Sequence, residues 1–186
     1  MWKDSKKFSQ LKHNWKSRWK DELIDILIFG SAVKGKLSPN DIDICLIFKD
    51  QPNLRLVKEV ESLLGEKYHV SFLNAENFFQ EVHSLSKTIL FEGASIITGK
   101  KLPEAYGLVP KLLYAYDLSP EAPSKKVRFV YLLRGRNGSE GLVKKFGGGF
   151  VSNSAFFIPL EKDKEMQEVL DQWKVKYTRQ KLLLMD

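Results

Sequence analysis

The stretch DILIFGSAVKGKLSPNDIDICLIF, residues 25–48, decides the fold of this chain. Its first apolar run ends in Gly30-Ser31, and a second run begins about ten residues later with Asp41-Ile-Asp43. The second run alternates and then becomes continuously apolar, which is typical of an interior strand. Because successive side chains of a strand point to opposite faces, we expect Asp41 and Asp43 to share one face. The stretch therefore predicts two strands, with a glycine turn after the first and two carboxylates at the start of the second.

The residue types in this stretch indicate a site for phosphates. Two carboxylates this close repel each other unless a cation lies between them, and carboxylate oxygens together with substrate phosphates suit Mg²⁺. A glycine lets the backbone approach a ligand, and the N–H groups and hydroxyl that follow can donate to a phosphate. Lys34 and Lys36 add positive charge nearby. A phosphate cradle opposite a carboxylate-held metal is typical of phosphoryl or nucleotidyl transfer.

The string FGS at residues 29–31, followed by NDIDI at 40–44, resembles the signature of the polymerase beta-like nucleotidyltransferase superfamily, in particular its minimal nucleotidyltransferases. The resemblance covers about residues 20–102 and closes on ILFEGASIITGK. It implies that a nucleoside triphosphate binds with Mg²⁺ or Mn²⁺, and that a nucleoside monophosphate passes to a hydroxyl of a protein, an RNA or a small molecule. The implied nucleotide-binding residues are Gly30, Ser31, Lys34 and Lys36, and the implied metal ligands are Asp41 and Asp43.

The chain departs from this family at the third carboxylate, which normally comes from the next strand. The corresponding string, KYHVSFL at residues 67–73, contains no acid. One alignment places His69 at that position, and a shift of two places Ser71 there. His69 would serve as a neutral ligand or base, or it is a replacement without a catalytic role. Two functions therefore stay open: a nucleotidyltransferase, or a degenerate transferase fold that binds nucleotide or nucleic acid.

Composition and charge set further bounds. The length of 186 residues fits one domain, or one domain with a smaller appendage, and a hydrophobic content of 43% is enough for a core. The net charge of +7 favours a polyanionic partner such as RNA or DNA, although two solvated basic faces explain it equally well. Cys45 lies inside an apolar run and is expected to be a buried thiol, with no disulfide or zinc site and a reducing cytoplasmic environment. No apolar run is long enough for a membrane span.

The periodicity predicts an α/β (α+β) fold in two domains. Residues 1–103 are expected to form a small mixed sheet flanked by helices, as in nucleotidyltransferases, and 104–186 a basic α+β domain with a hairpin. Lys125 to Leu133 is ambiguous between helix and strand. We expect helices at 5–22, 53–64, 75–91 and 163–173, strands at 23–29, 41–48 and 68–73, a hairpin of 142–146 with 150–158, and a last strand at 175–177 or 181–185. The stripe of Phe8, Leu11, Trp15 and Trp19 is interpreted as core packing.

Overall fold

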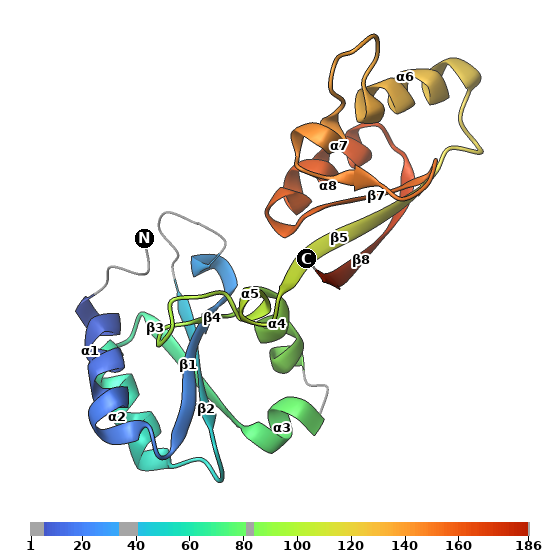
Figure 1. The fold of residues 1–186 in the computed structure, drawn as a ribbon. Coiled ribbons are helices and arrows are strands. Elements are labelled where there is room, and N and C mark those ends of the chain that lie inside the picture. The colour runs from blue at the N-terminus through green and yellow to red at the C-terminus, as the bar shows by residue number, and fades with distance from the viewer. Residues whose placement is uncertain (1–5, 34–40, 81–83, 186) are drawn as a thin grey trace. The chain divides into compact units, whose positions relative to one another are not determined.

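The computed structural model describes residues 6–33, 41–80 and 84–185. The chain forms two compact units, Met1–Gly107 and Leu108–Asp186. Each unit contains one four-stranded sheet and its own hydrophobic core (Figure 1).

The first unit is built on a mixed sheet with the strand order β3-β2-β1-β4. β1 is antiparallel to both of its neighbours, β2 and β4, whereas β2 and β3 are parallel, so the predicted mixed sheet is confirmed. Its elements are α1 Lys6–Asn14, a π-helical turn Trp15–Trp19, β1 Leu23–Phe29, a 3-10 turn Gly30–Ala32, β2 Ile42–Phe48, α2 Leu54–Leu64, β3 Tyr68–Asn74, α3 Ala75–Gln80, α4 Ser84–Glu92, β4 Ala94–Ser95 and α5 Leu102–Ala105.

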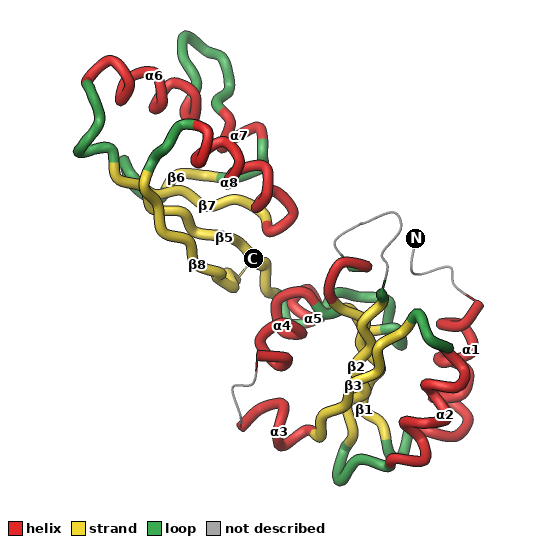
Figure 2. Tube along the Cα trace, turned by 180° about the vertical axis from the view of Figure 1, so that it is seen from behind, coloured by secondary structure: helices red, strands yellow, loops and turns green. Residues whose placement is uncertain are grey.

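Helices cover both faces of this sheet, with α1 and α2 on one side and α3, α4 and α5 on the other (Figure 2). The alternation along β2 explains the two layers. Ile44 and Leu46 pack into the core beneath α1 and α2, while Cys45 and Ile47 pack against Ile89 of α4. This double cover explains why the second half of β2 is continuously apolar.

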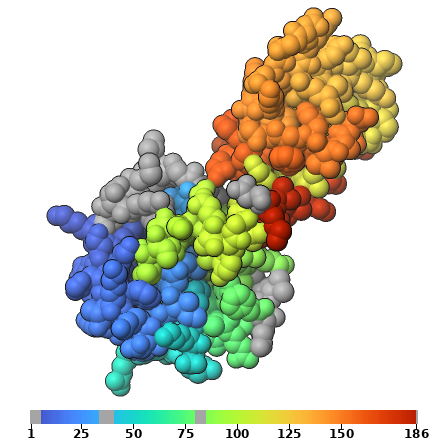
Figure 3. Space-filling model, in the orientation of Figure 1, coloured from blue at the N-terminus to red at the C-terminus, as the bar shows by residue number. Residues whose placement is uncertain are grey.

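The N-terminal stripe is core packing, as predicted. Phe8, Leu11 and Trp19 are buried, and Trp15 donates its Nε1–H to the carbonyl of Leu23 at 2.9 Å. The segment therefore covers the sheet with its apolar side. Its other side forms an outer surface of the unit, shown in blue in Figure 3.

The second unit has the strand order β6-β7-β5-β8, and all neighbouring strands are antiparallel. With its helices this is a βαββαβ arrangement, the ferredoxin-like topology. Its elements are β5 Leu108–Asp117, α6 Pro123–Arg134, α7 Leu142–Lys145, β6 Gly149–Phe150, β7 Ala155–Pro159, a 3-10 turn Leu160–Lys162, α8 Asp163–Gln172 and β8 Lys176–Met185. The helices lie on one face of the sheet, over a core that includes Tyr114, Phe129 and Phe156.

The predicted hairpin is wrong in both of its strands, and two ambiguities are resolved. Residues 142–146 were expected to be a hairpin strand, but Leu142–Lys145 is the helical turn α7, with Val143 buried in the core. Residues 150–158 were expected to be its partner strand, but the chain turns within them, and the hairpin pairs β6 with β7 instead. The ambiguous segment is the helix α6, and β8 runs as a single strand through both of its proposed segments. Among the described residues, no helix is both long and apolar enough to cross a membrane.

Candidate nucleotide-binding site

The end of β1 and the start of β2 are in close contact at Gly30. Gly30 has a φ of +73°, and a Cβ added to it would lie 2.5 Å from Oδ2 of Asp43. Two features therefore require a glycine at this position: the left-handed backbone, and the carboxylate that occupies the space of a Cβ. The result is that the Asp43 carboxylate lies directly against the backbone where the 3-10 turn Gly30–Ala32 begins.

Three strands bring the candidate residues together at one end of the sheet. Asp43 of β2 is paired with Phe29 of β1 on one side and with His69 of β3 on the other. Residues that are opposite each other in neighbouring strands share a face, so the His69 side chain emerges beside the Asp43 carboxylate. Asp41, just before β2, lies with its Oδ1 3.7 Å from Nε2 of His69, and both side chains are about two-thirds exposed, at 65% and 66%.

The register separates the two residues that the sequence offered for the third position. His69 is level with Asp43, whereas Ser71 is level with the buried Cys45. The Ser71 hydroxyl donates to the carbonyl of Ile44 at 3.1 Å. His69 is therefore the β3 side chain nearest in register to the carboxylate pair, and Ser71 has a structural partner.

Cys45 is a buried thiol, as predicted. It is fully buried, and burial raises its pKa to about 12, which keeps the thiol protonated at neutral pH. A thiolate is the reactive form of cysteine, so Cys45 supplies packing on this face of the sheet rather than chemistry.

Asp25, a carboxylate with a perturbed pKa, lies elsewhere in this unit. Burial raises the pKa of Asp25, although hydrogen bonds from Ser95 Oγ at 2.8 Å and from the N–H of Ile26 at 2.7 Å oppose the shift. Asp25 is four residues before Phe29 on β1, a distance of about 13 Å along a strand. Glu76 is also excluded by topology, because it follows the far end of β3 in α3. Neither residue replaces the third carboxylate.

The donor set at the site fits a divalent cation that is shared with a substrate. Asp41 and Asp43 offer carboxylate oxygens, the hard ligands that Mg²⁺ and Mn²⁺ prefer. Within the described part of the chain, no three His, Cys, Asp or Glu side chains form a complete metal site by themselves. Mg²⁺ commonly completes its shell with substrate phosphates and water, so two carboxylates suffice for a site of that kind. Lys34 and Lys36 lie outside the described residues.

Comparison with known proteins gives the same assignment for the first unit. Residues 8–96 match the family model of the nucleotidyltransferase domain, a segment that includes Gly30, Asp43 and His69. Over these residues the chain is similar to nucleotidyltransferase domains, and the resemblance to the polymerase beta-like superfamily is confirmed. No curated protein and no solved structure is significantly similar to the chain.

Proposed function

We propose that the first unit binds a nucleoside triphosphate with Mg²⁺ and transfers its nucleoside monophosphate to an acceptor hydroxyl. The observation that carries the proposal is the contact of the Asp43 carboxylate with the Gly30 backbone, beside Asp41 and His69. In this arrangement the turn at Gly30 and Ser31 would hold the triphosphate. The two carboxylates would hold the cation that joins the triphosphate to the protein.

The proposed transfer is an in-line displacement at the α-phosphorus. The acceptor oxygen forms a bond to phosphorus, the bond to the bridging oxygen of the β-phosphate breaks, and pyrophosphate leaves. A bound divalent cation would supply charge neutralisation for the phosphates during this step. The chain's own part is to position the triphosphate against the Gly30 backbone and to remove the proton of the acceptor hydroxyl.

His69 is the proposed acceptor of that proton. Its imidazole occupies the strand position beside Asp43, and Asp41 lies close enough to orient it. A neutral imidazole accepts one proton, which is the task of a general base.

Two substitutions at this position separate a base from a non-catalytic replacement. If His69 is the base, His69→Gln lowers the transfer rate about 100-fold or more, the usual contribution of general-base catalysis. His69→Asp would then restore part of that rate. If His69→Gln has no effect, His69 has no catalytic role. If His69→Asp transfers faster than the unmodified chain, His69 is a replacement that reduces activity. The assay is transfer of label from an α-³²P nucleoside triphosphate to a cell extract that serves as the acceptor pool.

The second candidate function is a binding module without transfer, and the observation that favours it is the histidine in place of a carboxylate. Such a module would bind nucleoside triphosphate and Mg²⁺, and equilibrium dialysis would detect this. It would transfer no label to any acceptor under conditions in which binding is saturated. Label on protein or RNA that depends on Asp41 and Asp43 would rule this alternative out.

A further inference from the structure

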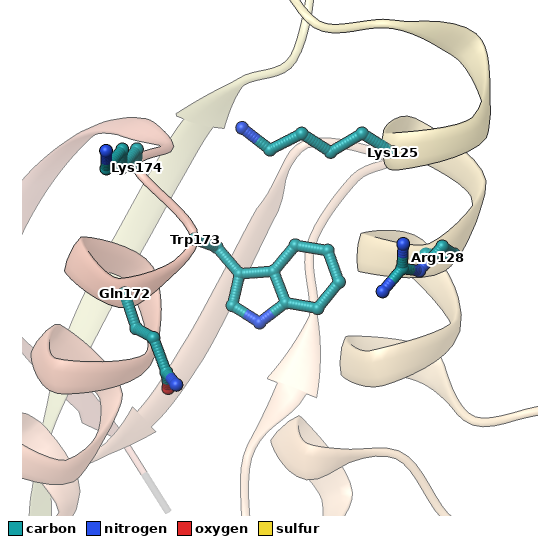
Figure 4. Close-up of a pocket in the computed structure, with 5 residues that line it drawn as sticks. All are labelled: Lys125, Arg128, Gln172, Trp173 and Lys174. Carbon is teal, nitrogen blue, oxygen red and sulfur yellow. The ribbon is translucent and has the colours of Figure 1, made fainter.

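An open pocket of about 450 Å³ lies within the second unit, which contains none of the candidate nucleotidyltransferase residues. Figure 4 shows the indole of Trp173 at its centre, with α6 on one side and the end of α8 on the other. A volume of this size suits a ligand as large as a nucleotide. The pocket is lined by Lys125, Arg128, Gln172, Trp173 and Lys174.

The pocket is cationic. Lys125 forms an ion pair of 2.7 Å with Glu121. Neither Arg128 nor Lys174 is paired with a carboxylate in the part of the chain that the structure describes. Lys125 and Arg128 are three residues apart on α6 and therefore share one side of that helix. Unpaired cations around a hollow favour an anionic ligand, and an arginine favours a phosphate in particular.

Trp173 gives the pocket an aromatic surface that is fixed in place. Its ring packs against Phe129 of the core, with ring centroids 5.4 Å apart, and remains partly exposed. The Arg128 guanidinium lies 5.8 Å from the ring centroid. An aromatic side chain beside cations is the combination on which bases of single-stranded nucleic acids stack while their phosphates are neutralised.

The backbone at Lys174 is a second, separate indication. The end of α8 is a Schellman motif, in which the N–H of Val175 donates to the carbonyl of Leu170 at 3.1 Å and the N–H of Lys174 to that of Asp171 at 2.9 Å. Lys174 has a φ of +53° at the position where glycine is the usual residue. A lysine is unfavourable in this conformation. Its presence therefore costs stability and places a positive charge at the rim of the pocket.

The surface beyond the pocket favours a strand of nucleic acid as the ligand over a free nucleotide. Tyr131 is 42% exposed and lies three residues after Arg128 on α6, and the Arg136 guanidinium is 5.0 Å from its ring centroid. α6 has 12 residues, or about 18 Å of helix, so cations and an aromatic ring continue beyond a single nucleotide. Residues 108–186 contain 14 Lys and Arg against 9 Asp and Glu, a net charge of +5.

We propose that the second unit binds single-stranded nucleic acid, with one base stacked at Trp173 and the flanking phosphates at Arg128 and Lys174. The strand continues along the exposed side of α6, the yellow segment at the outer surface of this unit in Figure 3. This binding requires neither nucleoside triphosphate nor divalent metal. It is therefore independent of the transfer proposed for the first unit.

The test is the affinity of the full chain for a fluorescently labelled 12-nucleotide oligo(U), measured by anisotropy in EDTA at several salt concentrations. Lys174→Gly removes the positive charge and also relieves the strain of the left-handed backbone at this position. We expect affinity to fall about tenfold, as on loss of a charged contact, and the dependence of log K on log salt to become shallower by about 0.7. The melting temperature should rise by a few degrees, which excludes unfolding as the cause.

Lys164→Gln is the matched control. It also removes one charge, from a side chain that is 90% exposed near the other end of α8, about 15 Å away. The proposal requires this variant to bind within twofold of the unmodified chain, and uridine monophosphate to compete poorly. Unchanged binding by Lys174→Gly, equal losses in both variants, or absence of binding would overturn it. If uridine monophosphate competes as well as the 12-mer does, the pocket binds a free nucleotide, and the proposal of a bound nucleic-acid strand is wrong.

Discussion

The contact between Gly30 and Asp43 gives a quantitative prediction for Gly30→Ala. The added Cβ would lie 2.5 Å from Asp43 Oδ2, whereas ordinary contacts begin at 3.4 Å, so the carboxylate must move by roughly 1 Å. The left-handed backbone, with φ at +73°, adds about 1–2 kcal/mol of strain. The end of a short side chain can rotate away at little cost, so we expect the stability loss to be mainly this backbone term. A 1 Å displacement of a reacting or ligating group costs up to about 100-fold in rate.

Gly99→Ala is the control for backbone strain. Gly99 has nearly the same φ, +74°, but a Cβ there would have nothing within 4 Å. Both variants are expected to lower the melting temperature of the first unit by similar amounts, about 4–8 °C for each kcal/mol in a domain of this size. Calorimetry measures this shift, and transfer from an α-³²P nucleoside triphosphate measures activity. Only Gly30→Ala should lose transfer. Full transfer by Gly30→Ala, or an equal loss in Gly99→Ala, would show that the contact of Gly30 with Asp43 is not needed for transfer.

Three further predictions concern stability. Burial raises the pKa of Asp25, so the folded state binds the proton of this carboxyl more tightly than the unfolded state does. The stability that the protonated carboxyl contributes is fully present below its ordinary pKa of 3.8 and is lost as the pH rises through the raised pKa of the folded state. Asp25→Asn, which stays neutral, should therefore be more stable than the unmodified chain at pH 7 but not at pH 3. The gain at pH 7 should be about 1.4 kcal/mol for each unit by which the pKa differs between the folded and unfolded states. Urea midpoints measure this at both pH values, and an equal loss of stability by Asp25→Asn at pH 3 and pH 7 would contradict it. Asn53 caps α2 by accepting from the N–H of Arg55 at 3.0 Å, and its amide nitrogen donates to the Glu22 carboxylate at 2.7 Å. Asn53→Ala should therefore lose about 1 kcal/mol, while Asn53→Ser keeps a capping oxygen and loses less; equal denaturation midpoints for Asn53→Ala and Asn53→Ser would contradict the cap. Tyr114→Phe removes a buried hydroxyl that donates to Asp163, so chemical denaturation should show that the free energy of unfolding falls by about 1 kcal/mol. An unchanged free energy of unfolding would show that this hydrogen bond does not stabilise the fold.

Much of the first unit follows from periodicity. β1, β2 and α2 were predicted within a residue or two, because each combines a clear apolar pattern with a strong end signal. For α2 that signal is Gly65, directly after the last residue of the helix. The pairing of β2 with β3, and hence the place of His69 beside Asp43, needed the structure, because sequence gives no register for a parallel pair.

The second unit was harder to predict for identifiable reasons. β5 was not assigned, because a proline within a run argues against a strand and Pro110 lies in this one. In the structure Pro110 is paired with Leu183 of β8 on one side only, since the pairing with β7 begins at Lys111. At that point the strand is at the edge of the sheet, where a missing N–H is tolerated.

The error at residues 142–146 has a similar physical source. Four or five residues are too few to show whether a pattern has the period of a helix or of a strand. Glu140 and Lys144, which form an ion pair of 2.8 Å at a helical spacing of four, were the available signal. Lys174 could not have been recognised either, because its left-handed backbone becomes visible only once α8 is seen to end at Gln172.

Nucleotidyl transfer by the first unit is tested by label transfer from each α-³²P nucleoside triphosphate, with Mg²⁺ or Mn²⁺ and a cell extract as acceptor pool. It is run with the unmodified chain, Asp43→Asn, and Asp50→Asn as a control on an exposed carboxylate outside the site. The account predicts labelled protein, RNA or small molecule with the unmodified chain and with Asp50→Asn, and a loss of about 100-fold or more with Asp43→Asn. Equal labelling by Asp43→Asn, or no labelling by the unmodified chain while it binds the nucleotide, would contradict nucleotidyl transfer at this site.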